Sequence, residues 1–441
     1  MVHDSKPRRS GRRVALIACY PMRDPAMPQF ISNHGMRMIE ATLRASDLEG
    51  LELQAYDLLS ATVEKLVAHV LAFDPDVVGF SAYLWSFPFF IEVATHLKQA
   101  DPSRLIVFGG PSARPSMFNL EPYRASKEIV DALVINEGER TFLEIVTMGD
   151  RSAAALSEVA GLALPTPDGW IDTPARPLAD LNELASPYRL KLVPHGGLGV
   201  LQTYRGCPFT CTFCEWGTLE SPRRVLDVDK LSAEFAAMGE HRVQGAILVD
   251  AGLNLNPHAF RNLRQAADQT GFLASRQLIC EIYPAKVTQD HLNFLSDVGA
   301  PHVGVGLQSF DKDVLSHVER SYDEGRFEEN LGRLTDIAPV ALEIIMGLPG
   351  DNPRTFRATF ERARSFKCAL RVYHCVVLPS ALMVRAPESY CMDFDTRTLK
   401  MRSCLGWSEA DIEAEGEFLN ERAAAEHGRT GQFFWVFPPR R

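Results

Sequence analysis

Apolar and polar positions alternate along the first third of the chain in a pattern typical of strands followed by helices. Short apolar runs bounded by turn residues predict buried strands, and apolar residues at every third or fourth position predict helices. The strands are expected at residues 14–20, 51–56, 76–82, 105–108 and 132–135. This alternation favours a doubly wound, Rossmann-like α/β domain, in which ligands bind at the carboxyl ends of parallel strands.

The same alternation returns after residue 197 and predicts a second α/β domain. Its strands are expected at residues 198–203, 245–250, 277–282, 302–307, 341–346 and 369–377. Six βα units in series predict a partial (β/α)6 barrel with its active site at the carboxyl ends of the strands. We divide the chain into a disordered basic tail (1–12), the Rossmann-like domain (13–150), a linker (151–192), the partial barrel (193–385) and a short C-terminal helical extension (386–441).

Composition narrows the class of protein. The chain has 441 residues, of which 46% are hydrophobic, and a formal net charge of −10 at pH 7. The hydrophobic content is high enough for packed cores. The negative net charge gives no indication of a nucleic-acid-binding surface. No apolar stretch of about 18 residues occurs, so we expect no membrane span. The nine cysteines have no disulfide-like rhythm, which predicts a protein of the reducing cytoplasm.

Three cysteines, Cys207, Cys211 and Cys214, lie within one short segment. Three thiolates at this spacing can hold three corners of a cubane iron–sulfur cluster, and one iron then stays open to a substrate or cofactor. Clusters that only transfer electrons use four cysteines, so an open iron indicates chemistry at the cluster. The alternatives are structural zinc, which needs a fourth Cys or His close by, and a disulfide with one spare thiol.

The segment 204–217, with Phe213 before the last cysteine, resembles the cluster loop of radical S-adenosylmethionine (SAM) enzymes. Segments 304–311 and 343–350 are similar to the fourth and fifth strands of many members of that superfamily. Three strand-end segments look like the domain that precedes the radical core in cobalamin-dependent members: 78–81, 108–110 and 136–139.

The resemblance implies a [4Fe–4S] cluster on the three cysteines and SAM on the open iron. In this family the reduced cluster passes one electron to the sulfonium of SAM, and a 5′-deoxyadenosyl radical forms. The residues implied to contact SAM are Phe213, Asp250, Glu281, Gln308, Ser309 and Arg320. Arginine fits the SAM carboxylate because its guanidinium is bidentate. The alternatives are a surface arginine for Arg320, a loop salt bridge for Glu281 and an Asx turn for Asp250.

The resemblance also implies cobalamin. The residues implied to contact it are Ser81, Tyr83, Leu84, Trp85, Gly109, Gly110, Glu137 and Gly138. The chain has no Asp-x-His-x-x-Gly motif, which supplies the usual histidine ligand, so we expect base-off cobalamin with no histidine ligand. We expect the loop 83–85 under the lower face of the corrin. The alternatives are a core aromatic for Trp85 and a plain turn for the two adjacent glycines.

The first functional hypothesis from this resemblance is a cobalamin-dependent radical SAM methyltransferase. It would methylate an unactivated carbon of a small or medium natural-product intermediate through a 5′-deoxyadenosyl radical and methylcobalamin. Cys375, on the sixth strand of the barrel, is a candidate hydrogen-atom donor, and the alternative is a buried inert thiol. The expected electron donor is a flavodoxin or ferredoxin, and we expect no nucleic-acid or membrane partner.

Two other hypotheses stay open at this point. An enzyme of the same architecture could catalyse a non-methylating rearrangement, cyclisation or ring contraction, with or without cobalamin. A cobalamin- or redox-sensing protein is the non-enzymatic alternative, although a sensor has no need of an open iron.

Overall fold

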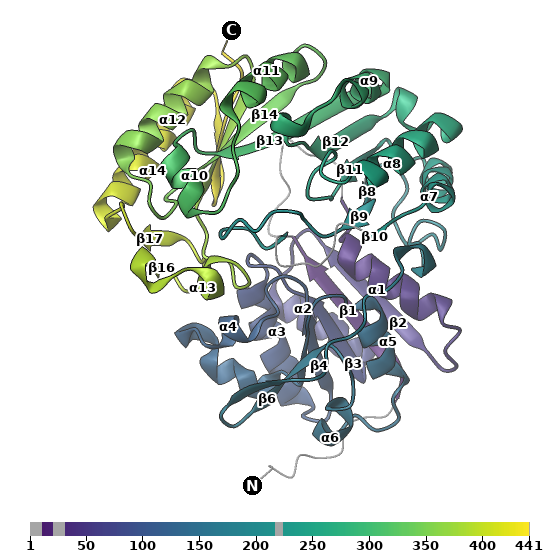
Figure 1. The fold of residues 1–441 in the computed structure, drawn as a ribbon. Helices are drawn as coiled ribbons and strands as arrows, with labels where there is room; N and C mark the ends of the chain where they lie inside the picture. Colours follow the sequence, from purple (N-terminus) through teal and green to yellow (C-terminus); the bar gives the residue numbers. More distant parts are fainter. Residues whose placement is uncertain (1–10, 21–30, 217–223, 441) are drawn as a thin grey trace. The chain divides into compact units, whose positions relative to one another are not determined.

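The computed structural model describes residues 11–20, 31–216 and 224–440 of the chain. The chain divides into two compact units, Met1–His195 and Gly196–Arg441. Each unit is built on its own large sheet, and the α/β fold class expected for both is confirmed (Figure 1). Most of the expected basic tail lies outside the described residues.

The sheet of the first unit has the order β2-β1-β3-β4-β5-β6-β7, and its first five strands are parallel. These are β1 (Arg13–Cys19), β2 (Glu52–Leu58), β3 (Val77–Ser81), β4 (Leu105–Gly109) and β5 (Ala132–Val134). The connecting helices include α1 (His34–Ala45), α2 (Val63–Phe73), α3 (Phe87–Ala100) and α5 (Glu139–Thr147). All five strands expected from the hydrophobic pattern therefore form, because their side chains build the core of this unit.

Part of the segment expected as a linker belongs to this first sheet. Strands β6 (Leu162–Thr166) and β7 (Gly169–Asp172) form an antiparallel hairpin, and β6 pairs with β5. The strands are difficult to predict from this short, Pro-rich sequence, because an edge hairpin needs only a few apolar residues on one side. The expected linker therefore contains two edge strands of the first sheet.

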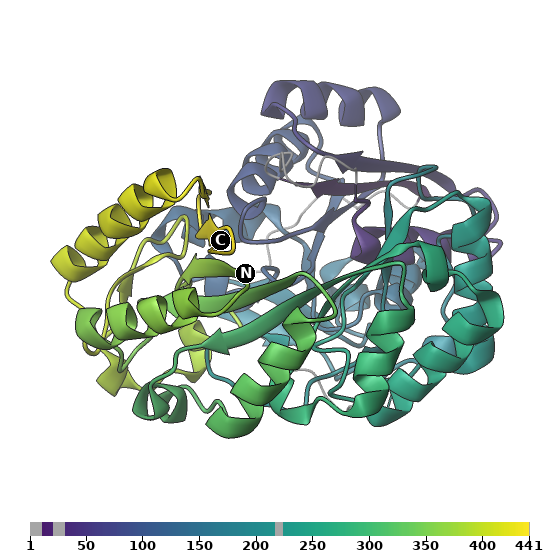
Figure 2. The ribbon, with the colours of Figure 1, turned by 90° about the horizontal axis from the view of Figure 1, so that it is seen from above.

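The sheet of the second unit has the order β18-β19-β15-β14-β13-β12-β11-β8. Its parallel strands are β8 (Leu198–Leu201), β11 (Gly245–Leu248), β12 (Gln277–Glu281), β13 (Ala300–Gln308), β14 (Val340–Met346) and β15 (Ala369–His374). Between them run α7 (Val228–Glu240), α8 (Pro257–Thr270), α9 (Gln289–Asp297), α11 (Glu324–Thr335) and α12 (Pro353–Ser365). Figure 2 shows helices of this unit along one side of the curved sheet.

We expected a helical C-terminal extension, but the extension also contains strands. It contains α14 (Glu409–Ala425) and the short strand pair β16 (Asp393–Phe394) and β17 (Met401–Ser403). Two more short strands, β18 (Arg429–Thr430) and β19 (Phe434–Phe437), follow, and β19 pairs antiparallel with β15. The extension thereby covers the edge of the barrel sheet that would otherwise stay unpaired.

The two faces of the barrel sheet differ in burial. Along β14, Leu342, Ile344 and Met346 are buried, whereas Glu343 and Ile345 are half-buried. Strand β15 repeats this pattern, because successive side chains of a strand point to opposite faces. We call the less buried face, which carries Glu343 and Arg371, the inner face.

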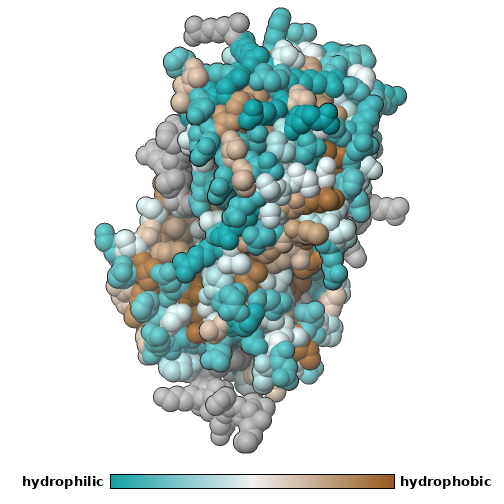
Figure 3. Space-filling model, turned by 90° about the vertical axis from the view of Figure 1, so that its left-hand side faces the viewer, coloured by the Kyte–Doolittle hydropathy of each residue, from teal (hydrophilic) through white to brown (hydrophobic). Residues whose placement is uncertain are grey.

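No helix in the described part of the chain is both long and apolar enough to cross a bilayer. Figure 3 shows a face of the molecule on which hydrophilic side chains dominate and apolar ones gather only in scattered groups.

Candidate functional site

The beginning of the cysteine-bearing loop, residues 204–216, is anchored by the end of β11. The carboxylate of Asp250 accepts hydrogen bonds from the backbone amides of Thr203 and Tyr204, at 2.8 and 3.3 Å, and from the Thr203 hydroxyl. The Tyr204 hydroxyl donates to the carbonyl of Gly252 at 2.8 Å. Burial raises the pKa of Asp250 to about 7. Both carboxylate oxygens are therefore already engaged in holding the loop, and a contact with SAM stays a prediction.

The three cysteines of this loop, which we call the cluster loop, are free thiols. Cys211 is buried, and Cys207 and Cys214 are half-buried. The amide of Cys214 donates to the carbonyl of Cys211 at 3.1 Å, which closes a tight turn between these two cysteines. Burial raises the pKa of Cys207, and it raises that of Cys214 to about 11. The metal-free thiols therefore hold protons that iron would displace on binding.

The donor set of the cluster loop fits a [4Fe–4S] cluster with one open corner. Within residues 11–20, 31–216 and 224–440, no three His, Cys, Asp or Glu side chains converge on a single-ion position. A cubane cluster instead takes its thiolates at separate corners. The residues that would hold it are Cys207, Cys211 and Cys214. Nη1 of Arg320 lies 3.9 Å from Sγ of Cys211, so one cationic side chain already faces this set.

Three of the residues predicted for SAM meet over two glycines of β13. The Glu281 carboxylate lies against Gly304, where an added Cβ would stand 2.0 Å from Oε1. At Gly306 an added Cβ would meet Nε2 of Gln308 at 3.0 Å, and Nη2 of Arg320 donates to the Gly306 carbonyl at 2.5 Å. A β-bulge between Gly306 and Gln308, with φ of 76° at Gln308, ends the strand here. The glycines therefore clear the space in which these polar side chains gather.

A second polar group lies on the inner face of β14 and β15. Oε1 of Glu343 accepts hydrogen bonds from Nη1 of Arg371, at 3.1 Å, and from the hydroxyl of Tyr373, at 3.2 Å. Burial, and next the charge of Glu343, raise the pKa of Glu281 above its usual range. Burial likewise raises the pKa of Glu343. The inner face thus presents two carboxylates, an arginine and a phenol, which suit a ligand with charged and hydrogen-bonding groups.

The other predicted residues of the barrel have different surroundings. Ser309 is fully buried, its hydroxyl oxygen lies 3.3 Å from that of Thr359 on α12, and it accepts the amide of Asp311 at 3.1 Å. Cys375 is 3% exposed, and burial raises the pKa of its thiol. Phe213, which lies between Cys211 and Cys214 in the sequence, is half-buried. The structure does not bring Ser309 and Cys375 to the group around Arg320, and their roles stay predictions.

At the carboxyl edge of the first sheet, the loops after β3 and β4 approach each other closely. The amide of Ala82 donates to the carbonyl of Gly109 at 2.7 Å. Gly110 has φ of 95°, and an added Cβ there would stand 2.7 Å from the carbonyl oxygen of Ala82. The rings of Tyr83 and Trp85 stack with centroids 4.8 Å apart. The two glycines therefore permit a loop-to-loop contact beside an aromatic surface.

Asn33 lies at the centre of this edge and was not predicted from the sequence. Its side-chain oxygen caps α1 by accepting the amide of Met36 at 2.9 Å, and it accepts the hydroxyl of Ser81 at 3.2 Å. Asn33 also forms side-chain hydrogen bonds that lower the pKa values of Tyr20 and Tyr83, although burial raises both overall. These residues make a polar and aromatic platform at the ends of β1 and β3.

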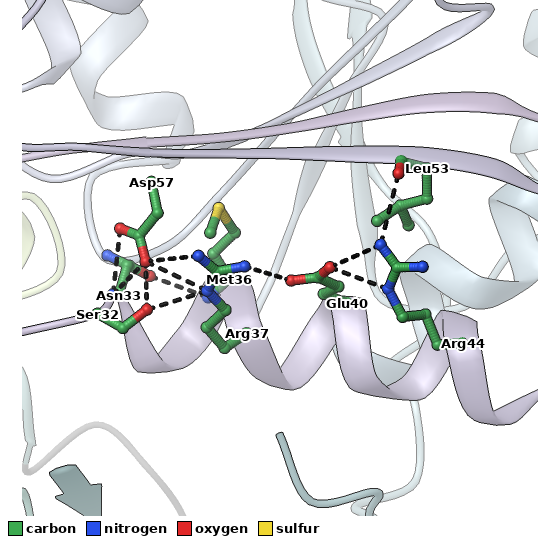
Figure 4. A network of polar contacts seen from close by, with 8 residues as sticks. All are labelled: Ser32, Asn33, Met36, Arg37, Glu40, Arg44, Leu53 and Asp57. Carbon is green, nitrogen blue, oxygen red and sulfur yellow. Dashed lines mark hydrogen bonds and ion pairs between the residues drawn. The ribbon is translucent and has the colours of Figure 1, made fainter. Parts of the chain in front are cut away.

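The platform is anchored through a network on α1 and β2 (Figure 4). Asp57 accepts hydrogen bonds from the amide of Asn33, at 3.1 Å, and from Nε of Arg37, at 3.2 Å. Arg37 also donates to Glu40 at 2.6 Å, and Glu40 accepts a hydrogen bond from Arg44 at 3.0 Å. The first turn of the helix is thereby fixed to the carboxyl end of β2.

The remaining residues predicted for cobalamin surround this platform. Leu84 is half-buried. The carboxylate of Glu137 accepts the amide of Ala179 at 3.3 Å. Gly138 is the N-cap of α5, where an added Cβ would stand 3.0 Å from Cδ1 of Ile39. All three follow the carboxyl ends of β3 and β5, as the strand pattern predicts.

The sequence reasoning missed three groups of functional candidates. Glu343, Arg371 and Tyr373 had a usable signal, since they occupy alternate positions of two neighbouring strands that are otherwise apolar. Asn33 had a weaker signal, as an N-cap residue before a helix. Arg385, which is described below, had no local signal because its contacts lie about 170 residues earlier in the chain.

Comparison with known proteins matches both units. Residues 201–363 match the model of the radical SAM superfamily, and residues 27–146 match that of the B12 binding domain. The described cysteines, Glu281 and Arg320 lie in the first range, and the platform residues Asn33 and Trp85 lie in the second.

Two curated relatives match along most of this chain. One is the 2-(S-pantetheinyl)-carbapenam-3-carboxylate methyltransferase of Streptantibioticus cattleyicolor, 28% identical over 89% of this chain and 59% of its own length. The other is the cobalamin-dependent radical SAM methyltransferase TokK of Streptomyces tokunonensis, 27% identical over 74% of this chain and 51% of its own length. The chain therefore spans between half and three-fifths of these relatives.

A solved structure agrees with the fold. The radical SAM methyltransferase TsrM from Kitasatospora setae superposes with a TM-score of 0.65 over 85% of this chain and 75% of its own, at 18% sequence identity. At this identity the likeness supports the architecture alone.

Proposed function

Because the chain belongs to the cobalamin-dependent radical SAM enzymes, we propose that it methylates an unactivated carbon of a small or medium natural-product intermediate. One observation carries the proposal: three free thiols in one loop lie beside Arg320, whose Nη1 is 3.9 Å from the sulfur of Cys211. The two curated relatives described above, both named as methyltransferases, support methylation over a rearrangement or cyclisation. The activities in those names belong to the relatives, and the substrate of this chain is part of the proposal.

The cofactors divide the chemistry between the two units. When bound, the cluster and SAM supply a carbon radical, and cobalamin supplies the methyl group. In our proposal Arg320 binds the carboxylate of SAM, and Glu281 accepts its ammonium group. Gln308 contacts the ribose, since its Oε1 is buried and without a hydrogen-bond partner in the described part of the chain. Phe213 packs on the adenine, and the contacts of Ser309 and Asp250 with SAM remain part of the proposal.

Cobalamin is proposed to bind the platform of the first unit with its tail base detached and with no histidine ligand. The support is chemical, since the platform holds the stacked rings of Tyr83 and Trp85 beside the buried side-chain amide of Asn33. Neither a carboxamide engaged in hydrogen bonds nor an aromatic ring is a strong ligand for cobalt. The detached tail and the corrin edge would meet Ser81, Leu84, Gly109, Gly110, Glu137 and Gly138.

The substrate is proposed to bind over the inner face, where Glu343, Arg371 and Tyr373 lie. Arg371 uses Nη1 for Glu343, and its side chain is 42% exposed, so other guanidinium donors remain for a ligand. Glu343 and Tyr373 orient that guanidinium. This polar group sits among small and aliphatic side chains of the same face, a composition that suits an organic molecule of moderate size.

The partners we propose are a flavodoxin or ferredoxin as electron donor and a small-molecule substrate, without nucleic acid or membrane. We place the enzyme in the cytoplasm, since all nine cysteines are free thiols and a cluster with an open iron needs a reducing compartment.

The test is anaerobic reconstitution with iron, sulfide and a corrinoid, followed by reduction in the presence of SAM labelled in its methyl group. We expect 5′-deoxyadenosine together with labelled, carbon-methylated product from a candidate intermediate. The variant with Cys207, Cys211 and Cys214 all replaced by alanine should give neither. Formation of 5′-deoxyadenosine with a rearranged but unlabelled product would overturn the methyltransferase assignment and leave the radical SAM assignment intact.

A further inference from the structure

The cluster loop is held from outside by a segment far along the chain, residues 378–391. Helix α13 (Leu382–Arg385) ends in Arg385, whose guanidinium donates to backbone carbonyls of the cluster loop. Nη2 reaches the carbonyls of Cys211 at 3.0 Å and of Thr212 at 3.4 Å, and it also donates to that of Cys214. Nη1 reaches the carbonyl of Thr210 at 3.3 Å. One side chain therefore binds four carbonyls within five residues, including those of two cluster ligands.

Neighbouring residues of the same segment add two more ties. The amide of Ser380 donates to the Glu215 carboxylate at 3.0 Å. The hydroxyl of Tyr390 donates to the carbonyl of His317 at 2.5 Å, and the next residue, Val318, accepts the amide of Thr212 at 3.2 Å. Arg385 thus acts within a small scaffold that surrounds the cluster loop.

This geometry has a consequence for the thiols. A short loop that ligates a cluster has few internal backbone hydrogen bonds, so its carbonyls need outside donors. A planar guanidinium can satisfy several carbonyls at once because its donors form a rigid fork. With these carbonyls fixed toward Arg385, the φ and ψ angles of residues 210–214 are restricted, and the directions of their Cα–Cβ bonds are restricted with them.

The charge of Arg385 has a second consequence. Reduction adds one negative charge to a cluster, and a fixed cation at a few ångströms stabilises the reduced form more than the oxidised form. Arg320 contacts the sulfur of Cys211 directly, whereas Arg385 acts through the peptide groups of the ligating residues. Arg320 therefore contacts a cysteine sulfur of the cluster loop, whereas Arg385 contacts its backbone carbonyls.

We propose that Arg385 is a positioning residue for the iron–sulfur cluster. It holds the cluster loop in its ligating conformation and raises the reduction potential of the cluster. The inference rests on the cluster assigned above, and it does not depend on methyl transfer, on cobalamin or on the identity of the substrate.

The test compares Arg385→Met, Arg385→Lys and Arg397→Met with the wild type, all as full-length chains. Arg397→Met is the matched control, because Arg397 is an exposed arginine that follows Arg385 closely in the chain. After anaerobic reconstitution, we would measure iron and sulfide per chain, the rate of iron loss to a chelator, and the midpoint potential by EPR-monitored titration. Thermal unfolding of the metal-free proteins reports whether each variant is folded.

We expect iron loss from Arg385→Met to be faster by about tenfold or more, because hydrogen bonds from a charged donor are among the strongest in proteins. Its midpoint potential should be more negative than that of the wild type. Arg385→Lys keeps the charge but cannot span four carbonyls, so its potential should stay near wild type while its iron loss is still accelerated. Arg397→Met should match the wild type in both measurements.

The proposal is overturned if iron loss from Arg385→Lys and Arg385→Met equals that of the wild type. It is also overturned if the control, Arg397→Met, loses iron as fast as the two Arg385 variants. Should Arg385→Met fail to fold, the rate measured for Arg385→Lys decides. If the wild type itself takes up no cluster on its three cysteines, the assignment under Proposed function fails first, and that outcome is distinguishable from a failure confined to Arg385.

Discussion

Replacing Gly304 by alanine tests the geometry proposed for the SAM side of the site. The backbone of Gly304 is not in the left-handed region, so alanine is sterically allowed there as far as the backbone is concerned. Its Cβ, however, would stand 2.0 Å from Oε1 and 2.5 Å from Cδ of Glu281. Contacts below 3.0 Å do not persist, so the Glu281 carboxylate must move away from β13.

The size of the effect follows from what moves. Glu281 has a flexible side chain, and an off-rotamer shift costs about 0.5–1.5 kcal/mol, so the folded state should be only mildly destabilised. A hydrogen bond from the SAM ammonium group to the Glu281 carboxylate is worth about 1.5–3 kcal/mol. Loss of this bond should weaken SAM binding about tenfold to a hundredfold.

The assay is equilibrium binding of SAM to the reconstituted protein by calorimetry, with unfolding measured in parallel. Gly332→Ala is the control, since an added Cβ there meets nothing within 4 Å. A double-mutant cycle with Glu281→Ala isolates the cause, because Gly304→Ala should add little once the carboxylate is gone. Wild-type affinity in Gly304→Ala, or full additivity of the two changes, would refute the role given to Glu281.

Three further predictions concern the other anchors. Gly110→Ala should destabilise the protein by about 1–3 kcal/mol more than Gly50→Ala in denaturant unfolding. Both glycines have positive φ, but only at Gly110 would an added Cβ meet a backbone oxygen. Equal effects of the two substitutions would contradict this. Asp57→Ala should cost about 1–3 kcal/mol and weaken corrinoid binding, because it removes the acceptor of the Asn33 amide and one of the two carboxylate partners of Arg37, and an unchanged stability would argue against the network. The pKa of Asp250 is raised from 3.8 to about 7, so the folded protein binds this proton more tightly than the unfolded chain. The stability of the wild type should therefore fall relative to that of Asp250→Asn as pH rises from about 4 to 7. The same pH dependence in both proteins would contradict this prediction.

The sequence by itself determined most strands of the two parallel sheets and pointed to the three cysteines as candidate metal ligands. Apolar runs such as 14–20 and 105–108 form buried parallel strands, because only a core buried on both faces tolerates them. The spacing of the three cysteines is local, so it could be interpreted without any knowledge of the fold. The order of strands then placed the candidate loops at the carboxyl edges.

Only the tertiary structure decided which side chains meet. The bulge before Gln308 brings it beside Arg320, while Ser309, the next residue, lies against α12, and a strand pattern does not reveal a bulge. Asp250 is engaged by the chain's own amides, which became evident only once β8 and β11 were neighbours. Arg385 contacts a loop about 170 residues away, and contacts of this kind depend on how distant segments pack, which local sequence does not encode.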